Sequence, residues 1–185
     1  MRTRSLFNYL DGNSQNARGF VGEDDVYRVL TLHSSLNKLH SKIIYNLNLE
    51  NPKVQIDLIY INKDGVFVIE VKNWTGSING SQEDTYWFRK HFVNHRLRVD
   101  RYLNPVRQNE YHINHLKRYI PINVPIYNLV VFASNNASHL KIDNVLSITK
   151  LSRYLLNLKS EVTLKDDDID YIYNNLNEIK QKVVK

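Results

Sequence analysis

From Gln55 to Trp74 the chain reads Q-I-D-L-I-Y-I-N-K-D-G-V-F-V-I-E-V-K-N-W. Residues 54–61 and 66–71 are rich in large apolar side chains and have the length and composition of two β-strands. The Asp64-Gly65 pair between them favours a tight turn, because such turns need residues that tolerate positive φ. We therefore predict a β-hairpin at the centre of the fold.

Three charged residues, Asp57, Glu70 and Lys72, interrupt the apolar strands of this hairpin. Side chains alternate between the two faces of a strand. If Asn62 pairs with Gly65, Asp57 lies opposite Glu70, whereas the next register places Asp57 opposite Lys72 and diagonal to Glu70. Both registers keep the three charges on one face.

Two carboxylates about 5–8 Å apart repel each other and raise a pKa unless a positive charge lies between them. A divalent cation, which prefers oxygen ligands, is the natural candidate. Lys72 would then lie beside the cation, where it could orient a water or stabilise the charge of a transition state. The alternative is a hairpin at a sheet edge whose charges are solvated or ion-paired. The strands are apolar on both faces, which favours a functional site over a free edge.

These residues resemble the core of the PD-(D/E)XK nucleases, in which an Asp on one strand precedes an E-x-K motif on the next. More narrowly, the chain resembles the nuclease-related domain family, NERD. The matching segments extend from about Gly19 to Ala133 in the order of the family. They are Gly22-Glu23, Gln55-Ile56-Asp57, Gly65 to Trp74, Gly76, Trp87, Asn104-Pro105, Gln108 and His112.

The resemblance implies an α/β fold with a restriction-endonuclease-like core, in which helices flank a central mixed β-sheet. It also implies a metal-dependent nuclease that hydrolyses phosphodiester bonds of nucleic acid, with DNA as the expected substrate and Mg²⁺ or Mn²⁺ as the cofactor. The expected catalytic residues are Asp57, Glu70, Lys72 and Gln108, and the expected metal ligands are Asp57, Glu70, Val71 and Glu23.

Two of these residues also have simpler explanations. A helix is predicted from Gly19 to about Leu36, and Glu23 would fall in its first turn, where negative charge is favoured. A second helix is predicted to start at Asn104-Pro105, with Asn as N-cap and Pro in the first turn. Gln108 on that helix could serve as a capping or surface residue instead of supporting the site.

Basic residues concentrate between residues 89 and 118, where eight Lys and Arg oppose two acids and account for the whole net charge of +6. Such a stripe is typical of a protein that binds a phosphate backbone, and a solvated face is the alternative. Residues 92–99 alternate apolar with polar or basic side chains, which predicts a strand with one basic face. The expected nucleic-acid-binding residues are Arg89, Lys90, Arg96, Arg98, Arg101 and Arg107.

Composition excludes several other classes. The chain has no Cys, which rules out disulfides, thiolate zinc sites and thiol nucleophiles and fits a cytoplasmic protein. No stretch approaches about 20 apolar residues, and the N-terminus lacks the apolar segment of a secretory signal, so no membrane partner is expected.

The length of 185 residues suits one domain. We expect an N-terminal arm at 1–18 and a single nuclease-like domain at 19–185. Its motifs lie in a core at about 19–133, and a helical extension follows at about 149–185.

The expected partner is nucleic acid, and the sequence leaves a homodimer open. The alternative function is a nucleic-acid-binding module that keeps the nuclease fold but does not cut. A third interpretation is a structural or partner-binding domain in which the three charges form only a salt-bridge network. The complete Asp, Glu and Lys set favours the nuclease.

Overall fold

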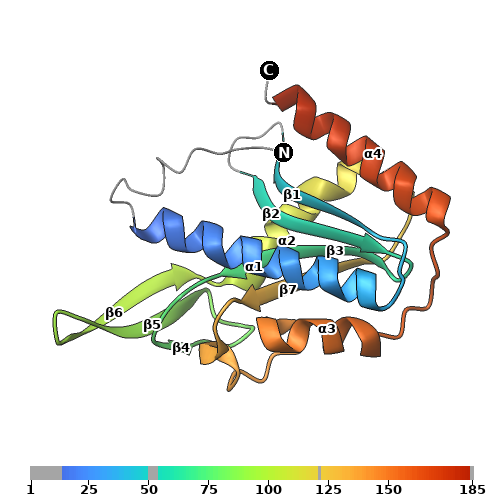
Figure 1. Cartoon of the computed structure of the whole chain (residues 1–185). Helices are drawn as coiled ribbons and strands as arrows, with labels where there is room; N and C mark the ends of the chain where they lie inside the picture. Colours follow the sequence, from blue (N-terminus) through green and yellow to red (C-terminus); the bar gives the residue numbers. More distant parts are fainter. Residues whose placement is uncertain (1–13, 50–53, 121, 184–185) are drawn as a thin grey trace.

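The computed structural model describes residues 14–49, 54–120 and 122–183 (Figure 1). In chain order the elements are α1 (Ser14–Leu36), β1 (Lys42–Asn48), β2 (Gln55–Asn62), β3 (Gly65–Lys72), β4 (Ser77–Asn79), β5 (Tyr86–Val93), β6 (Arg96–Leu103), α2 (Pro105–Leu116), a 3₁₀ helix (Lys117–Tyr119), β7 (Ile126–Phe132), a 3₁₀ helix (Asn135–Ala137), β8 (Val145–Ser147), α3 (Ile148–Asn157) and α4 (Asp166–Val183). None of the described helices is both long enough and apolar enough to cross a membrane.

The central sheet has five strands in the order β1-β2-β3-β7-β8. The β1–β2 and β2–β3 pairs are antiparallel, whereas β3–β7 and β7–β8 are parallel. The predicted α/β fold with a central mixed sheet flanked by helices is therefore confirmed. A second, antiparallel sheet contains β4, β5 and β6.

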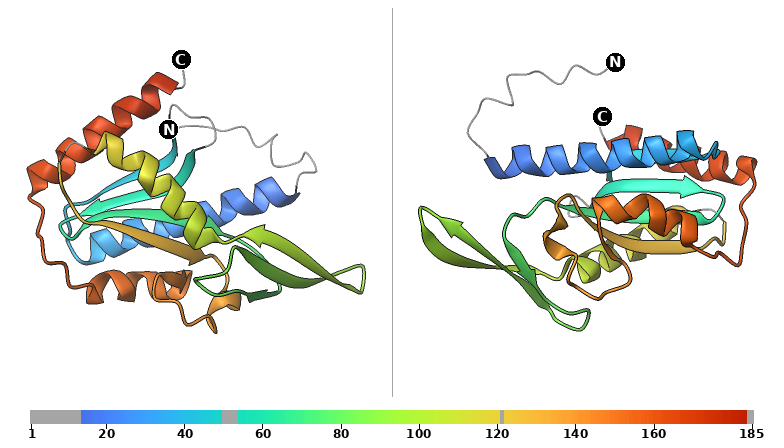
Figure 2. Two further views of the ribbon diagram at one scale, coloured as in Figure 1. Left: turned by 180° about the vertical axis from the view of Figure 1, so that it is seen from behind. Right: turned by 60° about the horizontal axis from the view of Figure 1, so that its bottom comes forward.

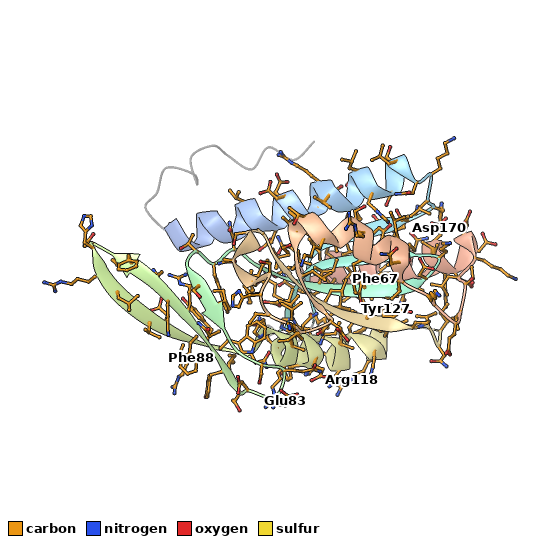
Figure 3. The ribbon with its side chains drawn as sticks, turned by 90° about the horizontal axis from the view of Figure 1, so that it is seen from below. Phe67, Glu83, Phe88, Arg118, Tyr127 and Asp170 are labelled. Atoms are coloured by element: carbon orange, nitrogen blue, oxygen red, sulfur yellow. The ribbon has the colours of Figure 1, made fainter. Side chains whose placement is uncertain are left out.

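Helices cover both faces of the central sheet (Figures 1 and 2). Apolar side chains of α1 and α3 pack on one face, and those of α2 and α4 pack on the other. Stacked rings of Phe67 and Tyr127, 4.8 Å apart, join β3 to β7 within the core (Figure 3). Every residue of β3 except Lys72 is buried, which explains the near-continuous apolar composition of this strand.

The predicted central hairpin adopts the register that pairs Asn62 with Gly65. The Asn62 side chain accepts the Asp64 N–H at 2.9 Å and shapes the turn. Gly65 has a φ of 138°, and a Cβ there would lie 2.6 Å from the Pro125 carbonyl oxygen. Glycine is therefore required at this position both by conformation and by space.

The prediction of one strand over residues 92–99 is wrong. The chain reverses direction at Asn94 and His95, whose φ angles are 48° and 62°, and so forms the β5–β6 hairpin. Two-residue hairpin turns use positive φ at both central positions, and Asn adopts this conformation more readily than most residues. The turn contains neither Gly nor Pro, so its sequence reads as a continuation of the strand. The hairpin projects away from the central sheet (Figures 1 and 2).

Candidate active site

The central sheet opens at Asp57. Pairing of β1 with β2 skips Asn46 and Asp57, and Asn46 has a φ of 52°. Pairing of β2 with β3 ends at Leu58 and Ile69, one residue before Asp57. The Val71 N–H donates to Oδ2 of Asp57 at 2.8 Å. The Asp57 carboxylate thus takes the place of a backbone acceptor and is fixed at the carboxyl end of β3.

Glu70 and Lys72 lie at the same end of β3. The Glu70 side chain is only 3% exposed, and Lys72 Nζ donates to its Oε1 at 2.5 Å. Lys72 Nζ also donates to Oε1 of Gln108 at 3.2 Å and lies 5.6 Å from the ring centre of Trp74. The hairpin and α2 therefore bring three of the four predicted catalytic residues into direct contact.

His112, which the set of expected site residues omitted, completes the surroundings of Glu70. Its Nδ1 lies 3.5 Å from Oε2 of Glu70, and within the described structure both atoms are buried without a hydrogen bond. Burial, opposed by the Glu70 charge, lowers the pKa of His112, so the ring is neutral at pH 7. The signal in the sequence was its position four residues after Gln108, which places both side chains on one face of α2.

The pKa values of Asp57 and Glu23 are both raised at this site. Burial and then the Glu70 charge raise the pKa of Asp57 to about 8, although the Val71 N–H and Lys72 oppose the shift. Burial and the Glu70 charge also raise the pKa of Glu23, against hydrogen bonds from Tyr45 and Asn46. The site thus holds more acidic groups than Lys72 alone neutralises, and this is the electrostatic condition that a bound cation relieves.

Glu23 comes to the site on α1, from the opposite face of the sheet. Helix α1 begins at Ser14, so Glu23 lies well beyond the first turn and the helix dipole does not explain it. A Cβ at the preceding Gly22 would lie 2.9 Å from Cβ of Asn73, just beyond the end of β3. Glycine at this position therefore permits the close approach of α1 that brings Glu23 to the carboxylates.

Helix α2 is fixed by two buried asparagines. Asn104 is its N-cap, as predicted: Oδ1 accepts the Val106 N–H at 2.9 Å, and Nδ2 donates to three carbonyl groups of the loop at 81–84. Asn109 is fully buried and donates from Nδ2 to the carbonyls of Val68 in β3 and Leu129 in β7, at 2.8 and 3.1 Å. These bonds hold α2 against the strand that carries Glu70 and Lys72, and so fix the neighbouring Gln108.

The donor atoms suit a hard divalent cation. Asp57, Glu70 and Glu23 supply only carboxylate oxygens, and one oxygen of Glu70 lacks a hydrogen bond within the described structure. In the part of the chain that the structure describes, no three or more His, Asp or Glu side chains are arranged as a complete metal-binding group. Mg²⁺ commonly uses one or two carboxylates and keeps several waters, which requires no such group. Coordination by the Val71 carbonyl stays a prediction.

The predicted nucleic-acid-binding residues divide between two faces of the β5–β6 hairpin and α2. Cross-strand pairing places Arg89, Arg96 and Arg98 on one face and Lys90 and Arg101 on the other. On the first face, Asp100 accepts from Arg98 at 2.7 Å and lies 3.4 Å from Arg89. Arg107 lies on α2, apart from the hairpin, and donates to the Glu83 carbonyl.

A cleft of about 590 Å³ connects the candidate site with the root of the hairpin. Trp74 and Tyr102 stack in its wall, with ring centres 4.4 Å apart. The residues of the site that line the cleft are Lys72, Gln108 and His112, and the neighbouring α2 and β6 contribute Tyr111 and Leu103. A substrate lying in the cleft would therefore contact Lys72 directly.

Comparison of the sequence with known proteins identifies its family. The model of the nuclease-related domain, NERD, matches residues 18–133. An uncharacterized protein of Bacillus anthracis is 29% identical over 168 residues, which cover 86% of this chain and 75% of that protein. No solved structure matches the chain. The matched segment spans more than half of the chain and contains Glu23, Asp57, the E-V-K motif and Gln108, so this protein belongs to the nuclease-related domain family.

Proposed function

We propose that this protein is a metal-dependent nuclease that hydrolyses phosphodiester bonds of nucleic acid, with DNA as the expected substrate. The observation that supports it best is the contact of Glu70, Lys72 and Gln108 beside Asp57, next to the cleft that Lys72 and Gln108 line. Family membership supports the same reaction class but does not identify the substrate.

Asp57 and Glu70 are the proposed ligands of Mg²⁺ or Mn²⁺, with the Val71 carbonyl and Glu23 as further ligands. The bound cation supplies Lewis-acid polarisation of the phosphate and a more acidic water. The carboxyl oxygens contribute negative charge that is unfavourable without the cation, since the pKa values of Asp57 and Glu23 are raised. Binding is therefore expected to release a proton from Asp57 below about pH 8.

Lys72 provides positive charge at the cleft, which Arg107 also lines. Its ammonium group is held between Glu70 and Gln108, and in this position it can stabilise negative charge on a phosphate oxygen or orient a water. Gln108 acts as a positioning residue, because its contact is with Lys72 Nζ. His112, neutral and packed against Glu70, restricts the orientation of that carboxylate.

A cleavage assay tests the proposal. Linear, nicked, supercoiled and single-stranded DNA are incubated with the parent, Lys72→Ala and Glu70→Gln in Mg²⁺, Mn²⁺ or EDTA. We expect cutting by the parent that requires the cation and falls at least 100-fold in both variants, because each removes a charge from the site. Lys150→Ala, which removes an exposed lysine of α3, is the control for a general loss of positive charge.

Two results would reject the nuclease. Salt-sensitive DNA binding without cutting by any variant would indicate a binding module that keeps the fold. If added Mg²⁺ does not change the melting temperature and its titration into the protein gives no heat of binding, the charges form only a salt-bridge network. Thermal unfolding of each variant in EDTA excludes loss of folding as the cause of lost activity.

A further inference from the structure

One face of the β5–β6 hairpin is entirely exposed. Because paired residues of an antiparallel ladder point to the same side, alternate positions of both strands form this face. We call it the aromatic face, and it consists of Tyr86, Phe88, Lys90, Phe92, Leu97, Val99, Arg101 and Leu103. All eight are exposed, and Phe92 and Leu97 reach 74% and 61%. Phe88 is labelled on the hairpin in Figure 3.

The opposite face of the hairpin differs in both packing and charge. Its Trp87 is fully buried and stacks with Phe132 of the central sheet. Its Arg89, His91 and Arg98 surround Asp100. Among the described residues, by contrast, no carboxylate pairs with Lys90 or Arg101, and the aromatic face contains no acid. The aromatic face is thus both apolar and positively charged.

Exposed apolar residues are common singly, but a continuous set on a projecting hairpin indicates a binding surface. A second copy of the chain would bring Lys90 and Arg101 against their own counterparts in an apolar interface without an acid, which is unfavourable. A partner that carries many negative charges and also flat apolar groups matches both the positive charge and the apolar character of the face.

From this we propose that the aromatic face binds an unpaired strand of nucleic acid, whose bases stack on its rings. Tyr86, Phe88 and Phe92 lie on one side of β5, with alternate positions about 7 Å apart, so the rings of Phe88 and Phe92 can each receive a separate unstacked base. Lys90 lies among these rings, and the Arg101 guanidinium carbon lies 4.4 Å from the ring centre of Tyr86, where both can contact phosphates. A duplex keeps its bases stacked and would leave the exposed rings without partners.

The face leads toward the candidate site. Leu103, its last residue on β6, lines the same cleft as Lys72 and Gln108. A strand bound along the hairpin can therefore continue into the cleft. This continuation into the cleft rests on the proposed function, and it specifies that the substrate contains a single-stranded segment.

Fluorescence anisotropy with a labelled oligo-dT of about 16 nucleotides tests the inference, in EDTA so that no cutting occurs. We expect the parent to bind oligo-dT more tightly than a blunt duplex of the same length. Phe88→Ala and Phe92→Ala should each weaken binding of oligo-dT by roughly 5- to 100-fold. Lys90→Ala should lower the salt slope by about 0.7. Tyr171→Ala, which removes an exposed aromatic residue of α4, is the matched control and should bind as the parent does.

Three outcomes would overturn the inference. The parent could bind the duplex as tightly as oligo-dT, or the folded Phe88→Ala and Phe92→Ala variants could bind oligo-dT as tightly as the parent. The third outcome is a dimer, seen in light scattering, that the two variants abolish without changing binding of oligo-dT. The high exposure of Phe92 makes its truncation safe for folding, so this variant carries the test if Phe88→Ala unfolds.

Cleavage in Mg²⁺ or Mn²⁺ separates this inference from the proposed function. If the parent binds oligo-dT through the aromatic face but cuts nothing, the inference stands and the nuclease falls. If all variants cut oligo-dT as the parent does, the nuclease stands and the inference falls.

Discussion

Replacing Asp57 by Asn is expected to stabilise the protein when no divalent cation is present, and the gain should increase with pH. Burial and the Glu70 charge raise the pKa of Asp57 from 3.8 to about 8. Between these values the folded protein holds a proton that the unfolded chain releases, so folding stability falls as pH rises. Asn cannot ionise, and its Oδ1 can still accept the Val71 N–H.

The size of the effect follows from the shift in pKa. About four pKa units correspond to at most about 6 kcal/mol between the protonated and ionised forms. Asp57 is only partly buried, so solvent screens part of the repulsion, and we expect a gain of about 2 kcal/mol at pH 8.5. For a chain of this size that gain raises the melting temperature by roughly 6 °C. At pH 5, only about one unit above the pKa of 3.8 in the unfolded chain, the gain should be roughly a quarter as large.

Thermal and urea unfolding in EDTA at both pH values measure the difference. Asp100→Asn is the matched control, because hydrogen bonds from His91 and Arg98 outweigh burial and lower the pKa of Asp100. The contribution of Asp100 is present above about pH 4 and is lost as pH falls, so its replacement should destabilise at both pH values. A loss of stability in Asp57→Asn at pH 8.5 would refute the electrostatic argument.

Three further predictions concern Lys72, the attachment of α2 and the turn of the β5–β6 hairpin. Lys72→Met should cost about 3 kcal/mol in urea unfolding, because Glu70 is left buried without its cation, and adding Glu70→Gln should recover most of the loss. Asn109→Ala should cost about 2–3 kcal/mol with an unchanged urea m-value, since carbonyls of β3 and β7 lose their donor. His95→Gly should stabilise by about 0.5–1 kcal/mol in thermal unfolding, because glycine adopts the φ of 62° without strain; no gain would argue against the turn.

The central hairpin and the start of α2 could be predicted from sequence because their signals are local. Gly65 indicated where the turn of the hairpin ends, and Asn104-Pro105 indicated both the cap and the first residue of a helix. Alternation then placed Glu70 and Lys72 on one face. The contact between Lys72 and Gln108 came from the family resemblance, since no local rule brings a strand and a helix 36 residues apart together.

Other features could not be predicted because they depend on tertiary contacts or on weak local signals. Asn94-His95 adopts a turn that most sequences build with glycine, and its alternating neighbours indicated one strand. The opening of the sheet at Asp57 coincides with the left-handed conformation of Asn46, which nothing in the strand pattern indicated. The start of α1 at Ser14 lies in a polar segment without helical periodicity, so Glu23 was placed in the wrong turn.

The bonds of Asn109 also have a consequence for kinetics. They join α2 to β3 and β7, whereas the aromatic face lies on a hairpin that projects beyond the central sheet. Movement of the hairpin need not change the distances between Glu70, Lys72 and Gln108. On the proposed function, substrate capture therefore resides mainly in the projecting hairpin, and hydrolysis resides in the part of the core that Asn109 holds together. Changes in the aromatic face should act mainly on KM, and changes near Asn109 should act mainly on kcat.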